Sequence, residues 1–168
     1  RLPCVSGKDS MKNDYGSGPE KISIPPTLLF SLFGDHPDVR RTATSDFKRS
    51  GDKIYLVGTS NQELGASELA FMMTETGQTD GIGGQVPQLP HPEENLAMYR
   101  ALSTTIRAGI VRTAHDCSEG GLAVALAEMC IGGRMGASVD VDGTGSGDVW
   151  GRLWGESLGR FVVAVSQD

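Results

Sequence analysis

The sequence has no long hydrophobic run, few cysteines and no excess of basic residues. No apolar stretch approaches the roughly 18 residues that span a membrane, and no secretory signal is recognisable, so we expect a cytoplasmic protein without membrane contact. Cys4, Cys117 and Cys130 are an odd number without C-x-x-C spacing, which argues for reduced thiols rather than a disulfide framework or a zinc site. With 15 basic against 21 acidic residues, the net charge of −6 argues against a nucleic-acid partner.

What the sequence does have is enough length for a core and a large amount of glycine. Its 168 residues, 38% hydrophobic and 21% charged, suit one globular domain over residues 1–168. Glycine occurs 23 times and accounts for the slightly low apolar content. Because the chain starts with arginine and runs at once into a motif-like stretch, we expect it to be a piece of a longer protein.

The most informative stretch runs from Gly109 to Gly133. It begins with a predicted strand, Ile110–Ala114, which leads through a polar turn into a helix. Ser118 suits the N-cap of that helix, and Gly132-Gly133 suits its C-terminal end. One buried helical face is predicted by the spacing of Leu122, Ala125, Leu126, Met129 and Cys130.

Two further glycines, Gly120 and Gly121, lie in the first turn of this helix. There each weakens the helix by about 1 kcal/mol relative to alanine, so a specific reason for them is expected. Bare backbone N–H groups at a helix start can meet a phosphate. The glycines can equally serve tight packing of the helix on a strand, and the sequence leaves both interpretations open.

Elsewhere, periodicity and turn residues predict the remaining elements. We expect a mobile loop over residues 11–21 and a β-rich run over Thr27–Phe33. The predicted strands are Leu2–Val5, Lys53–Val57, Ala137–Val141 and Arg160–Val165, and the predicted helices are Leu64–Glu75, a helix starting at Pro92, and Val149–Leu153. This order predicts an α+β fold, an α/β sandwich in which helices cover one sheet.

The turn from Ser6 to Ser10 has some features of a phosphate-binding loop. Gly7, Lys8 and Ser10 can donate N–H, ammonium and hydroxyl hydrogen bonds to a phosphate. The G-x-x-x-x-G-K-[ST] pattern is absent, because its first glycine is missing and Asp9 separates Lys8 from Ser10. Taken alone, a solvated turn is the commoner explanation.

Acidic residues mark two other candidate sites. Asp116 and Glu119 lie three apart across a helix start, so both can face one hard cation such as Mg2+, or simply complement the helix dipole. His115 suggests a general base, but no activated nucleophile accompanies it, and a structural histidine is the simpler interpretation. Glu156 precedes the last predicted strand and Arg160 begins it, and the two side chains either point into a site or form a surface ion pair.

Five motifs occur in a fixed order and at suitable separations along the chain. They are Val5–Met11, Ile24–Leu28, Asp38–Arg40, His115–Leu122 and Gly155–Phe161. Together they resemble the phosphoribosylformylglycinamidine synthase family, at the C-terminal domain of its second internal half. The resemblance covers nearly all 168 residues. It implies the fold of the AIR synthase C-terminal domain, a mixed sheet covered by helices.

The resemblance also implies an activity that this chain would have only as part of a larger enzyme. The family uses ATP and glutamine-derived ammonia to convert formylglycinamide ribonucleotide to the amidine. We therefore expect ATP and Mg2+ as cofactors and a nucleotide and a ribonucleotide substrate as ligands. The expected protein partners are the ATP-binding N-terminal half-domain of the same enzyme and a glutamine amidotransferase domain or subunit. On its own the chain is expected to be inactive, and it has the potential to dimerise.

Residue by residue, the resemblance implies a nucleotide site without a catalytic residue. Asp116 matches a position that ligates Mg2+, and Ser118 one that contacts nucleotide. Gly7, Lys8 and Ser10 match a motif that contacts ATP, metal and substrate in the small form of the enzyme. That form has asparagine where Lys8 stands, and an ammonium group cannot ligate Mg2+, so phosphate contact is expected of Lys8 and Ser10.

Further residues belong to the predicted nucleotide site. Gly120 and Gly121 complete the phosphate-binding residues through their bare backbone. Glu156 and Ser157 match a loop that contacts substrate in the other half of the enzyme, and Glu119 takes a place that varies between aspartate and glutamate. Additional candidates are Asp9 and His115.

The sequence leaves two alternative functions open. The domain can be a structural or auxiliary-nucleotide domain without chemistry of its own. It can also belong to a related enzyme of the superfamily, such as AIR synthetase or a selenophosphate synthetase-like enzyme.

Overall fold

The computed structural model of the chain describes residues 14–23, 30–78, 84–89 and 91–167. The chain divides into two compact units, residues 1–37 and residues 38–168. No helix in the described ranges has both the length and the apolar character needed to cross a membrane. The predicted strand Leu2–Val5 and the turn Ser6–Ser10 lie outside the described residues.

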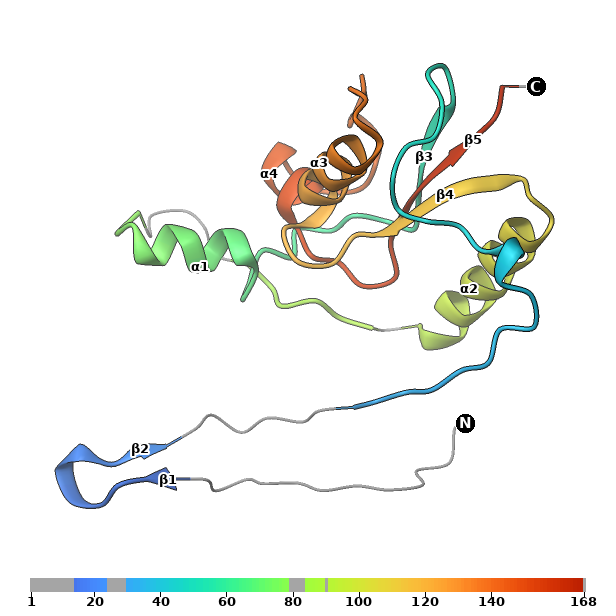
Figure 1. Cartoon of the computed structure of the whole chain (residues 1–168). Helices are drawn as coiled ribbons and strands as arrows, with labels where there is room; N and C mark the ends of the chain where they lie inside the picture. Colours follow the sequence, from blue (N-terminus) through green and yellow to red (C-terminus); the bar gives the residue numbers. More distant parts are fainter. Residues whose placement is uncertain (1–13, 24–29, 79–83, 90, 168) are drawn as a thin grey trace. The chain divides into compact units, whose positions relative to one another are not determined.

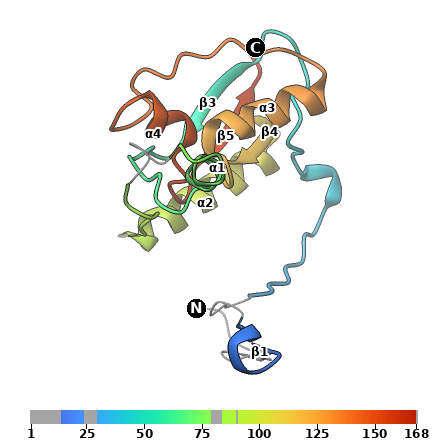
Figure 2. The same ribbon diagram turned by 90° about the vertical axis from the view of Figure 1, so that its left-hand side faces the viewer.

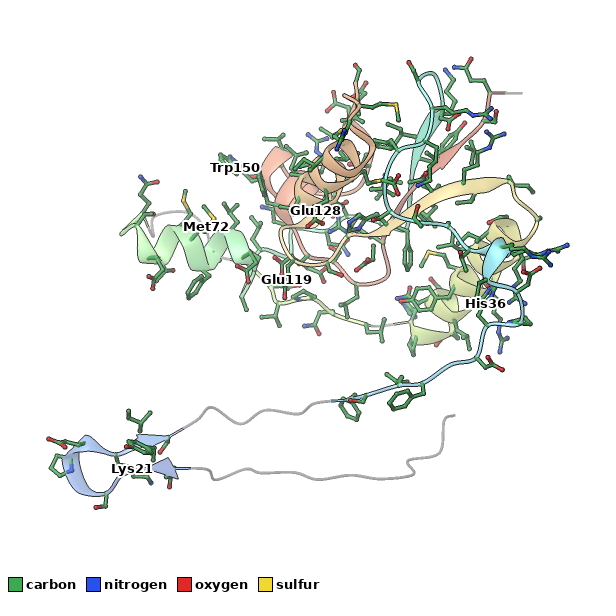
Figure 3. The ribbon with its side chains drawn as sticks, in the orientation of Figure 1. Lys21, His36, Met72, Glu119, Glu128 and Trp150 are labelled. Atoms are coloured by element: carbon green, nitrogen blue, oxygen red, sulfur yellow. The ribbon has the colours of Figure 1, made fainter. Side chains whose placement is uncertain are left out.

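The described part of the first unit is a small hairpin. Strand β1 (Asp14–Tyr15) pairs antiparallel with β2 (Ile22–Ser23), and the 3-10 helix η1 (Gly18–Glu20) lies between them. Lys21, labelled in Figure 3, reaches back to Asp14 with 2.7 Å between Nζ and Oδ2. The segment predicted as a loop over residues 11–21 therefore has hairpin pairing in its described part. Residues 30–33, in the run predicted to favour strand, form no strand.

The second unit is built on a three-stranded antiparallel sheet with the order β3–β5–β4 (Figure 1). Its strands are β3 (Lys53–Val57), β4 (Val111–Asp116) and β5 (Phe161–Val165). Its helices are η2 (Val39–Arg41), α1 (Glu68–Glu75), α2 (Pro92–Arg107), α3 (Gly121–Gly133) and α4 (Val149–Trp154). The α+β class is thus confirmed. Parallel pairing occurs in isolated bridges such as Thr44 with Thr113.

Helices cover both faces of this sheet. Helix α3 lies across β4 and β5 (Figure 2) and packs on the face that carries Val162 and Ala164. Phe161 is on the opposite face because side chains alternate along a strand, and its ring meets Tyr99 of α2 edge to face at 5.7 Å. The buried core comprises Phe47, Cys117, Leu122, Ala125, Leu126, Met129, Val162 and Ala164. Four of the five predicted core positions on α3 are buried, and Cys130 is half-buried.

The residues that cap α3 differ from the predicted ones at both ends of the helix. Gly120, not Ser118, is the N-cap, and it has a left-handed backbone. At the other end Arg134 closes the helix in the left-handed conformation, so Gly132-Gly133 is not the stop signal. A Cβ at Gly133 would lie 2.5 Å from the carbonyl oxygen of Phe47. The glycine pair is therefore explained by close contact with the chain beside Phe47.

Two other predicted elements are shorter or missing. The helix predicted from Leu64 begins at Glu68, because the Ser67 hydroxyl caps it by accepting from the Ala70 N–H at 3.2 Å. The predicted strand Ala137–Val141 does not form. Instead the N–H of Asp142 donates to the Asp140 carboxylate at 2.9 Å, and a local turn takes the place of strand pairing.

Candidate functional site

The turn after β4 brings together the site residues predicted around Asp116. Cavities of about 390 and about 370 Å³ flank this turn, and Asp116, Ser118 and Glu119 line both. Glu68 at the start of α1 and Glu128 on α3 complete the wall of the first cavity. Figure 3 shows Glu119 on the turn and Glu128 on the helix that follows it. The other predicted cluster, Gly7, Lys8, Asp9 and Ser10, lies outside the described residues.

Asp116 is held as an ionised carboxylate. The Ser118 hydroxyl donates a hydrogen bond to Asp116 Oδ2, and this bond holds the pKa of the carboxyl below its usual value. The side chain of Asp116 is 61% exposed. An ionised, accessible carboxylate suits a hard cation, while the Ser118 hydroxyl is occupied by Asp116 rather than by the helix amides.

His115 is tied down on both sides of its ring. Its Nδ1 lies 2.8 Å from the carbonyl oxygen of Asp116, and its Nε2 lies 3.0 Å from Glu128 Oε2. Both ring nitrogens lie against protein oxygens, which fixes the orientation of the imidazole between the turn and α3. The structural interpretation of His115 is therefore favoured.

Cys117, between the two halves of the turn, is an inert thiol. It is 5% exposed, and burial raises its pKa to about 11. A thiol with such a pKa stays protonated at neutral pH and is a poor nucleophile. Its N–H donates to the carbonyl oxygen of Arg160 at 2.9 Å, which fastens the turn to the start of β5.

The glycines at the start of α3 already have partners for their amides. The N–H of Gly120 donates to Glu156 Oε1 at 2.8 Å, and that of Gly121 donates to the carbonyl oxygen of Ser118 at 3.0 Å. Both glycines have positive φ, and a Cβ on Gly121 would lie 2.5 Å from the carbonyl oxygen of Gly155. Close packing and backbone conformation thus account for the two glycines, and a phosphate would have to compete for their N–H groups.

The side chains of Glu156 and Ser157 accept hydrogen bonds from backbone N–H groups instead of projecting freely. Glu156 Oε1 accepts from the N–H of Glu68 as well as from Gly120, at 2.8 Å in both cases. The buried Ser157 hydroxyl accepts from the Asn61 N–H at 2.9 Å. Both residues therefore join the 155–160 segment to turns that lie far away in the sequence.

Arg160 is buried, a placement that differs from both interpretations of its sequence position. It is 1% exposed, and its guanidinium donates to the Ser157 carbonyl at 3.1 Å, to the Ser60 hydroxyl at 2.8 Å and to the Gly155 carbonyl. The alternative of a surface ion pair with Glu156 is therefore wrong. The available signal was its position directly before the apolar strand that starts at Phe161.

Comparison with known proteins places this architecture in a family. Residues 49–168 match the family model described as AIR synthase related protein, C-terminal domain. The chain belongs to this family. The phosphoribosylformylglycinamidine synthase subunit PurL of Deinococcus radiodurans is 37% identical over 170 residues, which cover 97% of this chain and 22% of that protein. The chain thus spans about a fifth of the length of this relative, and the predicted resemblance is confirmed.

Solved structures share the fold of this AIR synthase-related domain. The structure described as T. maritima PurL complexed with FGAR matches with a TM-score of 0.63 at 23% identity, over 77% of this chain and 22% of that one. The structure described as T. maritima PurL complexed with ATP matches with a TM-score of 0.54 at 23% identity, over 77% and 20%. At this level of identity the likeness supports the fold.

The walls of the two cavities in this AIR synthase-related domain are acidic. The carboxylates that line them belong to Glu68, Asp116, Glu119, Glu128 and Glu156. Arg160 also lines the second cavity, but its guanidinium is already bonded to protein acceptors. Among the described residues, no group of three or more His, Cys, Asp or Glu side chains is arranged to hold a metal ion. A cation at Asp116 would therefore need ligands from outside this group, such as phosphate oxygens or water.

Proposed function

We propose that this domain works as part of an ATP- and glutamine-dependent C–N ligase that converts formylglycinamide ribonucleotide to formylglycinamidine ribonucleotide in purine biosynthesis. The observation that carries the proposal is the 37% identity to a phosphoribosylformylglycinamidine synthase subunit along 97% of the chain. The structures of PurL with ATP and with FGAR support nucleotide and ribonucleotide ligands for the complete enzyme. Because the chain spans about a fifth of that relative, the activity is proposed for the larger protein.

Within that enzyme, the proposed role of the domain is to hold a phosphate-bound cation at Asp116. Acidic walls repel a bare polyphosphate, so a phosphate can approach this turn only with a cation between it and the carboxylates. Asp116, ionised and accessible, would ligate Mg2+, and Glu119 would supply a second carboxylate. The Mg2+ would neutralise phosphate charge. Gly7, Lys8 and Ser10 remain proposed phosphate-binding residues of the complete enzyme, and Ser118 is proposed to orient Asp116.

The proposed protein partners are an ATP-binding half-domain and a glutamine amidotransferase domain or subunit. Apolar side chains that are exposed in the described part of the chain support a partner surface. Tyr55 of β3 is 55% exposed on the same face of the sheet as the buried Val163 with which it pairs. Phe71 and Met72 are likewise exposed on α1.

The decisive experiment replaces Asp116 with alanine in the full-length ligase. We expect the affinity for Mg-ATP to fall by at least about tenfold, with a matching loss of turnover, because a metal-binding carboxylate is removed. Titration calorimetry gives the affinity, and assay of the amidine product gives the turnover. Glu75→Ala, at the exposed end of α1, is the matched control and should change neither quantity.

The outcome also decides between chemistry and a structural role. Lost turnover in a folded, assembled Asp116→Ala enzyme supports the proposal. Unchanged affinity and turnover would contradict it. Lost folding or assembly would favour the alternative of a structural or auxiliary domain, which the internal bonding of the Gly120 and Gly121 amides also favours.

A further inference from the structure

One carboxylate oxygen in this molecule joins the starts of two helices. Glu156 Oε1 lies 2.8 Å from the backbone nitrogen of Glu68, the first residue of α1. It also lies 2.8 Å from the backbone nitrogen of Gly120, the N-cap of α3. Both N–H groups belong to helix starts, which leave backbone donors unsatisfied and carry a partial positive charge. A carboxylate is the acceptor that such a pair of donors favours.

The backbone around Glu156 is fixed to the rest of the domain, so this oxygen has a defined place. The N–H of Glu156 donates to the carbonyl oxygen of Glu63 at 3.1 Å. On its C-terminal side, Ser157 accepts from the Asn61 N–H, and the buried Arg160 donates to the Ser60 hydroxyl. The connection between β3 and α1 is thus held against the segment that carries Glu156.

Helix α1 buries few of its own side chains. Leu69 is its one buried residue, and Phe71 and Met72 are exposed (Figure 3 labels Met72). The cap at Ser67 bonds within the helix and its own preceding turn, to Ala70 and Leu64. The Glu156 carboxylate therefore links the start of α1 to Gly120 in the turn after β4.

The two hydrogen bonds to Glu156 connect residues that line the candidate site. Glu68 lines the 390 Å³ cavity from α1, and Asp116, Ser118 and Glu119 line it from the turn after β4. Glu156 itself lines the neighbouring cavity. Releasing the carboxylate would remove this side-chain bridge between the two walls of the first cavity, while the backbone bond from Glu156 to Glu63 remains.

We infer that Glu156 is a positioning residue, whose single carboxylate oxygen sets the spacing between the start of α1 and the Asp116–Gly120 turn. Its role at the site rests on the proposed function, whereas the spacing itself does not. Glu156 acts through Glu68 and Gly120 and is not assigned a contact with substrate. This role differs from the substrate contact that the family resemblance implies for Glu156.

The test measures hydrogen exchange at the two amides by NMR on the full 168-residue chain. In Glu156→Ala we expect the amide protons of Glu68 and Gly120 both to exchange at least about tenfold faster, because a charge-assisted hydrogen bond is lost at each. The amide of Ala125, in the buried middle of α3, should keep its exchange rate. Glu156→Gln keeps an oxygen acceptor, so it should restore most of the protection at both amides.

Glu75→Gln is the control, because Glu75 is an exposed carboxylate at the far end of α1 and should leave both rates unchanged. Faster exchange at one amide only, or at neither, would overturn the inference. Equal acceleration at Ala125 would also overturn it, since that result indicates a general loss of stability. If Glu156→Ala does not fold, Glu156→Gln decides, with a smaller acceleration confined to the two amides expected. Nucleotide binding by Asp116→Ala is a separate measurement, so failure of the proposed function leaves this test intact.

Discussion

At position 121, a missing side chain decides how α3 can begin. Gly121 has φ +65°, and a Cβ there would lie 2.5 Å from the carbonyl oxygen of Gly155 and 2.8 Å from that of Leu153. The end of α4 therefore approaches the start of α3 so closely that only glycine fits. The same approach places Glu156, the next residue after Gly155, within hydrogen-bond distance of Gly120.

Replacing Gly121 with alanine should therefore destabilise the domain without any ligand present. We expect the free energy of unfolding to fall by more than about 2 kcal/mol, from the left-handed backbone together with overpacking. Urea denaturation followed by circular dichroism measures it. Gly136→Ala is the control, since no atom lies within 4 Å of a Cβ there, and it should change stability by less than about 0.5 kcal/mol. Equal stability of the two variants would contradict the packing explanation.

At the scale of elements, α3 is the helix on which the core of the second unit depends. It supplies Leu122, Ala125, Leu126 and Met129 to the buried cluster, and the sheet contributes Val162 and Ala164. It also packs on α4. Helices α1 and α2 contribute little by comparison, because one residue of α1 is buried and none of α2.

Shortening one side chain on the buried face of α3 should therefore have a large effect. Met129 is 0% exposed, so Met129→Ala leaves a cavity and should cost about 2–5 kcal/mol of unfolding free energy. Ile131, on the same helix, is 76% exposed, and Ile131→Ala should cost less than about 0.5 kcal/mol. Thermal and urea unfolding of both variants check this. Similar losses of unfolding free energy in the two variants would contradict the burial of Met129 and the exposure of Ile131.

At the scale of the whole molecule, the division after residue 37 separates a small hairpin from the packed domain. All residues of the buried cluster, from Phe47 to Ala164, belong to residues 38–168. A two-stranded hairpin is marginally stable at best without a partner, and both residues of each of its strands are exposed. The second unit is thus expected to fold without the first.

Limited proteolysis tests this independence. Phe33 is 99% exposed in a segment without secondary structure, so brief treatment with chymotrypsin should cleave at Phe30 or Phe33. The product containing residues 38–168 should then unfold cooperatively, near the midpoint temperature of the intact chain. Mass spectrometry identifies the product, and calorimetry gives the transition. A product that unfolds without a cooperative transition would show that the core needs the first unit.

Local sequence signals determined several elements of this domain. The spacing of Leu122, Ala125, Leu126 and Met129 predicts the buried face of α3, because the helical period alone decides which side chains share a side. Strand β3 matches its prediction at both ends. Helix α4 begins where Asp148 caps the N–H of Gly151 at 2.9 Å, a contact between near neighbours. Asp116, Ser118 and Glu119 meet at one turn because they are adjacent in the chain.

Only the tertiary structure decided the features that join distant segments. The Glu156 carboxylate serves Glu68 and Gly120, and neither partner can be read from its local sequence. Arg160 is buried because carbonyl and hydroxyl groups from two turns converge on its guanidinium. The alternating residues 137–141 predict a strand, yet a strand needs a partner, and no strand within the described ranges pairs with them. Periods and caps act over a few residues, whereas burial, close contact and strand pairing depend on which remote segments the folded chain places together.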